Sequence, residues 1–188
     1  MRIADNLEES RTQIDCEDDL QAWIKAGMES NGWTVLREVK ARNSNYRADI
    51  VAQQDEIGTV GIECKYVSGG PIVAAEAGRQ IISKYASEKF FQWQVDVWGV
   101  CLFGRSFKPK EMLQKHERES SKTEIYTTKR ILNGFGIGYV TTNEDWVMMQ
   151  FLPSGRSVHI PLFGVDTEIG FEGVDFDRIR ELIDERRP

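Results

Sequence analysis

The sequence predicts a single α/β domain with a mixed central sheet flanked by helices, and three observations support this fold class. Helical and extended patterns alternate along the chain, as they do in proteins whose helices pack on a central sheet. Residues 95–104 (VDVWGVCLFG) form a near-continuous apolar run, which is typical of a strand covered on both faces. The 188 residues are enough for one hydrophobic core, and no convincing linker divides them.

The N-terminal part of the chain predicts a helix followed by three strands. The helix begins at Asp15, which can cap it, and ends near residues 30–33 (SNGW), which contain an Asn-Gly stop. Strands are predicted at 33–39 (WTVLREV), 46–53 (YRADIVAQ) and 59–67 (TVGIECKYV). In each of these segments, β-branched and aromatic residues gather between polar turns.

A second helix and a fourth strand complete a predicted core at about 15–104. The SGGP sequence at 68–71 breaks the chain after the third strand, and Ile72–Phe91 then has helical composition. The apolar run at 95–104 follows this helix as the fourth strand. The predicted order of the core is therefore α-β-β-β-α-β.

The remaining residues are expected to belong to the same domain, 1–188. Residues 105–125 are polar and include a proline, so they predict a basic loop or an exposed helix. Residues 126–188 are interpreted as a C-terminal extension, with a short helix, a strand, a hairpin and a closing amphipathic helix. The hairpin is predicted from two apolar segments, DWVMMQFL and SVHIPLF, on either side of the turn PSGR.

The composition is that of an ordinary globular protein, with 40% hydrophobic and 29% charged residues. The N-terminus lacks an apolar run of signal-peptide length, and no stretch approaches the roughly 20 apolar residues needed to span a bilayer. We therefore expect a cytoplasmic protein with no membrane partner. Its three cysteines are widely separated and form no CxxC pair, which argues against a disulfide framework or a zinc cluster.

The net charge of −6 is unevenly distributed along the chain. Residues 1–20 carry −5 and residues 166–188 carry −4, so residues 21–165 carry +3. The acidity of the whole chain therefore does not exclude a nucleic-acid partner for its middle part.

Three charged residues, Asp49, Glu63 and Lys65, stand on segments that otherwise predict buried strands. Charged side chains are almost never fully buried unless they are paired or bind a metal. Side chains alternate between the two faces of a strand, so Glu63 and Lys65 point the same way. If the two strands pair as a hairpin, the 14-residue interval from Asp49 to Glu63 puts both carboxylates at one end of the sheet.

Two neighbouring carboxylates repel each other, and one takes up a proton unless a cation lies between them. Mg²⁺ suits such a pair because it prefers carboxylate, water and phosphate oxygens, and Mn²⁺ is the alternative ion. A metal held in this way polarises a phosphoryl oxygen and activates its bound water. Lys65 can orient that water or offset charge that develops on the phosphate. The acid, acid and lysine therefore describe a site that cleaves phosphodiesters.

The motifs RADIVA (47–52) and GIECKY (61–66) resemble those of the PD-(D/E)xK, or restriction-endonuclease-like, nuclease superfamily. Glu63, Cys64 and Lys65 match its E-x-K element, and the resemblance extends over about 15–104, including the order of the elements. Within the superfamily it most resembles Holliday-junction resolvases and Mrr-like enzymes. It implies a restriction-endonuclease-like fold and a metal-dependent endonuclease that acts on DNA in restriction and defence or in repair and recombination.

The resemblance also implies roles for individual residues. Asp49 and Glu63 would bind Mg²⁺, the backbone carbonyl of Cys64 would complete the coordination, and Lys65 would assist the attacking water. Many relatives carry a glutamine and a tyrosine on the next helix with the spacing QxxxY. Here Gln80, the candidate contact to DNA or to a metal-bound water, precedes Tyr85 by five residues, so the sequence departs from that pattern. A second departure, Ala48 in place of proline before Asp49, changes little chemically.

Further residues are candidates for the site and for DNA contacts. Glu17, in the first turn of the first helix, either reaches the site or complements the positive end of its helix. Three cations near the catalytic residues are expected to contact the scissile strand: Lys40, Arg42 and Arg47. The stretch 105–130 has eight Lys or Arg against four Glu, and Lys108 and Lys110 within it are candidates for an arm that contacts phosphates. A solvated loop remains the alternative for that stretch.

Two alternatives to this reading remain open. Glu63 and Lys65 can form an ordinary salt bridge on a solvated face, although this leaves Asp49 unexplained. The domain can also be a catalytically silent DNA-binding or protein-interaction module on a nuclease-like scaffold. Within the enzyme reading, a junction resolvase requires two sites related by a two-fold axis and therefore a homodimer.

Overall fold

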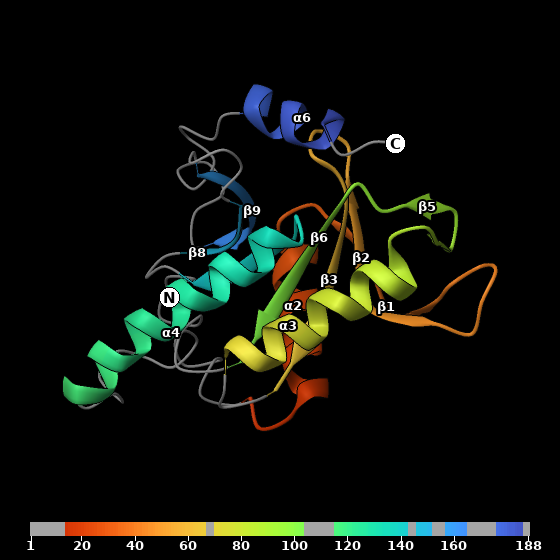
Figure 1. Ribbon diagram of the computed structural model, residues 1–188. Helices are drawn as coiled ribbons and strands as arrows, with labels where there is room; N and C mark the ends of the chain where they lie inside the picture. The colour runs from red at the N-terminus through yellow and green to blue at the C-terminus, as the bar shows by residue number, and fades with distance from the viewer. Residues whose placement is uncertain are drawn as a thin grey trace.

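The computed structural model describes residues 14–66, 70–103, 115–142, 146–151, 157–164 and 176–185. Within these residues the chain forms an α/β fold, a seven-stranded mixed sheet with four α-helices (Figure 1). The strands lie in the order β1-β2-β3-β6-β7-β8-β9. Their bounds are β1 Thr34–Lys40, β2 Arg47–Gln54, β3 Gly58–Lys65, β6 Val97–Leu102, β7 Gly138–Thr142, β8 Trp146–Phe151 and β9 Val158–Gly164.

The sheet is antiparallel at both sides and parallel in the middle. Strands β1, β2 and β3 form an antiparallel meander, and β6 lies parallel to β3. Strand β7 is parallel to β6, and β8 and β9 continue the sheet as an antiparallel hairpin. The predicted C-terminal hairpin is therefore confirmed, and it extends the central sheet.

The helices are α2 Glu17–Ser30, α3 Pro71–Gln80, α4 Lys115–Gly134 and α6 Phe176–Asp184. A π-helical turn, η1 (Ile81–Tyr85), continues α3 directly, and a separate hairpin of β4 (Lys89–Phe90) and β5 (Trp93–Gln94) precedes β6. None of the helices in the described part of the chain is long and apolar enough to cross a membrane.

Two hydrophobic cores lie on the two faces of the sheet. On one face, Leu20, Ile24 and Met28 of α2 pack with inward residues of the sheet such as Ile50 and Ile62. These three helix residues are spaced at i, i+4 and i+8, and all are fully buried, which is the pattern of an amphipathic helix. Helix α6 belongs to the same core, and α2 also contacts β9 at the far edge, so the sheet curls around this layer.

The second core lies beneath α3, η1 and α4. It joins Ala74 and Ala77 of α3 to Val51 of β2, Trp98 of β6 and Leu132 of α4. Small residues on α3 allow the helix to lie close to the strands that carry the charged motif. This layer therefore fixes the position of α3 over the same sheet face that receives Asp49 and Glu63.

The structure differs from the sequence prediction in two helices. The helix expected over Ile72–Phe91 ends at Tyr85, and the following residues form the β4–β5 hairpin. The short helix expected after residue 125 is the C-terminal part of the 20-residue α4, which begins at Lys115. The sequence predicted either a loop or an exposed helix for residues 105–125, and the structure has a helix from Lys115 onward.

Candidate active site

The pairing of β2 with β3 brings the two predicted acids to the same end of the sheet. Ile50 lies opposite Ile62 in this antiparallel pair, so Asp49 and Glu63 are the next residues of the two strands. Beyond this pair the two strands are held by a side chain, because the Oδ2 of Asp49 accepts the N–H of Cys64 at 2.7 Å. The expected hairpin and the expected meeting of the acids are both present.

Both carboxylates are buried. Asp49 is 9% exposed and Glu63 is 1% exposed, so neither belongs to a solvated face of the sheet. The Oε1 of Glu63 accepts hydrogen bonds from the Nζ of Lys65 and from the Nε2 of Gln80, each at 2.8 Å. The Oε2 of Glu63 is also buried and has no hydrogen-bond partner in the described residues while both carboxylates are ionised. A buried carboxylate oxygen without a partner is costly, and it marks a position where a ligand would be stabilised.

The pKa values of the two acids reflect this environment. Burial raises the pKa of Asp49 to about 7, and the neighbouring Glu63 carboxylate adds to the increase. Burial also raises the pKa of Glu63, against the opposing effect of the hydrogen bond from Lys65. Without a bound metal ion, the pair therefore retains a proton close to neutral pH even beside Lys65, as expected of two carboxylates that share one site.

Lys65 remains a cation in this cluster. Burial alone lowers its pKa, but the hydrogen bond to Glu63 and the charges of Glu63, Asp49 and Glu17 outweigh that effect and raise it. Glu17, at the start of α2, lies at the edge of the cluster, with its Oε1 3.9 Å from the Nζ of Lys65. The N–H of Tyr66 also donates to the Oε2 of Glu17 at 3.4 Å. The first helix thus brings Glu17 to the edge of the site, which was one of the two positions predicted for it.

Gln80 contacts both Glu63 and, across the π-helical turn that follows it, Tyr85. Its Nε2 donates to Glu63 and also to the hydroxyl oxygen of Tyr85 at 2.6 Å. An α-helix brings residues four apart together, whereas a π-turn, here closed by the bond from Ala86 N–H to the Ile81 carbonyl, accommodates one more residue. The five-residue spacing from Gln80 to Tyr85 therefore produces the contact that a four-residue spacing gives in a regular helix.

Tyr85 is a site residue that the sequence did not assign to a role. Its hydroxyl donates to the carbonyl oxygen of Arg47 at 2.9 Å, so it links α3 and η1 to the start of β2. Burial, with the nearby Glu63 charge, raises the pKa of Tyr85 to about 12, and the phenol therefore stays neutral. The departure from the QxxxY spacing is the one feature of the sequence that draws attention to Tyr85, but it does not reveal the π-turn.

The donor set of the site fits a hard divalent cation. In the described part of the chain, no group of three or more His, Cys, Asp or Glu side chains is arranged to hold a metal. The Asp49 and Glu63 pair, with the free Oε2 of Glu63, instead matches Mg²⁺, which binds one or two carboxylates and completes its shell with water and phosphate oxygens. The thiol of Cys64 lies in the core beneath α2, so only the backbone of Cys64 faces the site.

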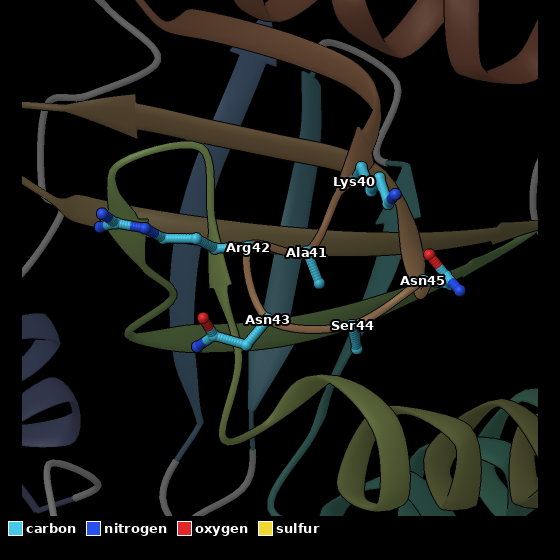
Figure 2. Close-up of a pocket in the computed structure, with 6 residues that line it drawn as sticks. All are labelled: Lys40, Ala41, Arg42, Asn43, Ser44 and Asn45. Carbon is cyan, nitrogen blue, oxygen red and sulfur yellow. The ribbon is translucent and has the colours of Figure 1, made fainter.

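Three of the cations expected to contact DNA lie in or at the ends of the β1–β2 loop: Lys40 ends β1, Arg42 is in the loop and Arg47 begins β2. Lys40 and Arg42 are exposed and line a hollow of about 400 Å³ formed by residues 40–45 of the β1–β2 loop (Figure 2). Arg47 is also exposed, and its guanidinium lies 3.4 Å from the carboxylate of Glu38. The other two candidates, Lys108 and Lys110, lie outside the described residues.

The strand opposite Asp49 carries a backbone distortion. Glu38 has a φ of +51°, a left-handed conformation that is uncommon for residues other than glycine, within the pairing of β1 with β2. The pairs Arg37–Ile50 and Val39–Ala48 enclose it, so Glu38 faces the position of Asp49. Strained backbone of this kind clusters at functional sites.

Comparison with known proteins assigns neither a family nor an activity. No family model and no curated protein matches the chain. A solved structure of a protein of unknown function from Silicibacter pomeroyi is similar to it over 94% of each chain, at 13% identity and a TM-score of 0.37. A similarity at that level carries no argument about this chain.

Proposed function

We propose that this protein is a metal-dependent nuclease that hydrolyses DNA phosphodiester bonds. The observation that carries the proposal is the pair of buried carboxylates, Asp49 and Glu63, with one buried oxygen of Glu63 left without a partner. Two acids buried together destabilise a fold unless something offsets their repulsion. A bound divalent cation offsets it, and Mg²⁺ takes one or two carboxylates as protein ligands.

The order of elements around the pair supports the resemblance to the restriction-endonuclease-like superfamily. From α2 to β6, apart from the small β4–β5 hairpin, the order is α-β-β-β-α-β, and the motif residues lie on the second and third strands. We propose that residues 15–104 form a core of this type and that Glu63, Cys64 and Lys65 act as its E-x-K element. The strands β7, β8 and β9 then extend that core.

In the proposed site, Asp49 and Glu63 hold Mg²⁺ or Mn²⁺. When bound there, the ion polarises a phosphoryl oxygen and lowers the pKa of a water molecule. Gln80 and Lys65 both donate to the Oε1 of Glu63, so they orient this carboxylate with its Oε2 available as a ligand. The backbone carbonyl of Cys64 is proposed as a further ligand.

Lys65 contributes as a charged group. In the metal-free site its raised pKa keeps the ammonium protonated, and we propose that it acts by electrostatic stabilisation and by orienting the attacking water. An ammonium fixed by Glu63 beside the cleavage position offsets the negative charge that develops on the phosphate. A role as an ordinary surface salt bridge fits less well, because its partner Glu63 is only 1% exposed.

A cleavage assay on a panel of DNA forms tests the proposal. Purified protein with Mg²⁺ or Mn²⁺ is incubated with duplex, nicked, branched and single-stranded DNA, and we expect cleavage of at least one form. Lys65→Ala should abolish cleavage and retain DNA binding. Lys25→Ala is the matched control, because Lys25 is also part-buried and also paired with a glutamate, Glu29, but lies on α2 away from the carboxylates.

Two outcomes would count against the proposal. If the wild-type protein leaves every DNA form intact with either ion, the nuclease assignment is wrong, and binding without cleavage would favour a catalytically silent module. If Lys65→Ala cleaves as fast as Lys25→Ala, the role given to Lys65 is wrong.

A further inference from the structure

The β4–β5 hairpin presents an aromatic side chain to solvent at its tip. Lys89 pairs with Gln94 and Phe90 with Trp93, so Phe91 and Gln92 form a two-residue turn. Phe91 has a φ of +57° and is 60% exposed. A bulky residue in this left-handed conformation is strained, and glycine or asparagine usually occupies such turn positions. The ring of Phe91 contacts that of Trp93 edge-on, with centroids 5.9 Å apart, and is otherwise open to solvent. Turn chemistry does not explain why phenylalanine stands there.

The hairpin is attached to the β1–β2 loop. Ala41 forms a β-bridge with Phe90, and the N–H of Arg42 donates to the carbonyl of Lys89 at 2.8 Å. Figure 1 shows the loop and β5 projecting on the same side of the molecule. The loop forms the hollow of about 400 Å³, lined by residues 40–45, and in Figure 2 the side chains of Arg42 and Asn43 extend away from those of Lys40 and Asn45. Loop and hairpin thus form one surface.

This surface is cationic although the whole chain is acidic. Residues 40–47 of the loop, with 84–94 of the hairpin and the adjoining end of η1, contain five Lys or Arg and one Glu, whereas the chain as a whole has a net charge of −6. The cations are Lys40, Arg42, Arg47, Lys84 and Lys89. One of these cations, Arg47, is paired with Glu38 of β1. A second exposed ring, that of Tyr46, is 41% exposed and lies 5.9 Å from the ammonium of Lys84. Exposed aromatic rings among cations are the features of surfaces that bind single-stranded nucleic acids.

Packed residues connect this surface to the carboxylate pair. Gln80 joins Glu63 to the Tyr85 hydroxyl, which donates to the carbonyl of Arg47 at the end of the loop. The ring of Tyr85 also packs edge-on against Phe90 of the hairpin, with centroids 5.8 Å apart. The aromatic tip and the carboxylate pair are therefore linked by one continuous set of contacts.

We propose that the β1–β2 loop and the β4–β5 hairpin bind an unpaired DNA strand next to the cleavage position, with the ring of Phe91 stacked on a base. The inference rests on the proposed function and narrows its substrates to single-stranded, flapped or branched DNA. Bases within an intact duplex are stacked on each other and offer no free face to an aromatic ring. The cations of the loop contact the phosphates of the same strand.

Binding measured without a divalent ion tests this inference separately from catalysis. Fluorescence anisotropy in EDTA compares a labelled single-stranded oligonucleotide of about 15 nucleotides, near the upper end of common site sizes, with a duplex of the same length. The wild-type protein should bind the single strand more tightly than the duplex. Phe91→Ala should weaken single-strand binding by about tenfold, the size expected for the loss of one stacked base, and Phe91→Tyr should restore it.

Two further variants separate binding from folding. Tyr126→Ala on α4 is the matched control, because Tyr126 is also an aromatic residue that is 60% exposed, and we expect its binding to be unchanged. Phe91→Gly relieves the left-handed strain, so it should unfold at an equal or higher temperature than the wild type while binding the single strand as weakly as Phe91→Ala.

The inference is overturned if Phe91→Ala binds the single strand normally, if Tyr126→Ala loses as much affinity, or if the duplex binds as tightly as the single strand. These failures leave the nuclease proposal standing, because cleavage is not measured. Conversely, if the protein binds single strands selectively but does not cleave DNA in Mg²⁺, the binding role of this surface is supported and the proposed nuclease activity is contradicted.

Discussion

Replacing Asp49 with asparagine should stabilise the metal-free protein above neutral pH. The folded protein holds the Asp49 proton up to about pH 7, whereas the unfolded chain releases it near the ordinary pKa of 3.8. The free energy of unfolding of the wild type therefore falls as the pH rises through that window and levels off above it. Each pKa unit corresponds to about 1.36 kcal/mol, so the raised pKa of Asp49 lowers the free energy of unfolding by at most about 4 kcal/mol.

The Asp49→Asn variant has no such titration, and its side-chain oxygen can still accept the N–H of Cys64. Urea unfolding in EDTA at about pH 8 should therefore give a variant more stable than the wild type by roughly 2–4 kcal/mol, with an unchanged m-value. The gain should shrink as the pH is lowered toward 4, because the wild-type carboxyl is then protonated in both states.

Asp55→Asn provides the control, because Asp55 is an exposed residue of the β2–β3 turn, and we expect no comparable gain. Saturating Mg²⁺ should stabilise the wild type, by about 2.7 kcal/mol when its concentration is about 100 times the dissociation constant. It should leave the stability of Asp49→Asn unchanged. The reasoning is refuted if Asp49→Asn is less stable than the wild type at about pH 8, or if its gain is independent of pH.

Three further outcomes are expected. Gln80→Ala and Tyr85→Phe should each lower the cleavage rate. Because both substitutions remove the same Gln80–Tyr85 hydrogen bond, a double-mutant cycle should give a coupling energy of roughly 0.5–3 kcal/mol, and additive losses would contradict this. Gly61→Ala places a Cβ 2.4 Å from an indole ring, so urea unfolding should show a loss of roughly 1–3 kcal/mol, whereas an unchanged midpoint would disprove the close packing. Glu17→Gln should slow cleavage less than Lys65→Ala; an equal loss would give Glu17 a larger role.

The alternation of side chains and the spacing of the motif were sufficient to predict the meeting of the two acids. Asp49 and Glu63 lie on successive strands joined by a short turn, so the hairpin is a local structure that the sequence pattern specifies. The same holds for α2, whose apolar stripe and stop signal predict both its buried face and its end. Local signals of this kind depend on few tertiary contacts.

Features that depend on tertiary contacts could not be predicted in this way. The helix predicted to Phe91 ends at Tyr85, where a π-turn lets the Tyr85 hydroxyl reach Arg47 on another strand. The sequence KFFQWQ (89–94) does not indicate which of its aromatic rings is buried. In the structure Phe90 is buried, whereas Phe91 is 60% exposed. The joining of β7 to β6 likewise pairs strands separated by the whole of α4. Long-range pairings leave only weak traces in a local pattern.

The central claim is that Asp49 and Glu63 together bind a divalent cation, and a Mn²⁺ titration followed by electron paramagnetic resonance tests it most directly. We predict one Mn²⁺ site in the wild type that Mg²⁺ displaces, that is lost in Asp49→Asn and in Glu63→Gln, and that is retained in Asp55→Asn. Equal Mn²⁺ binding by all four proteins, or no binding by the wild type with or without DNA, would contradict the claim.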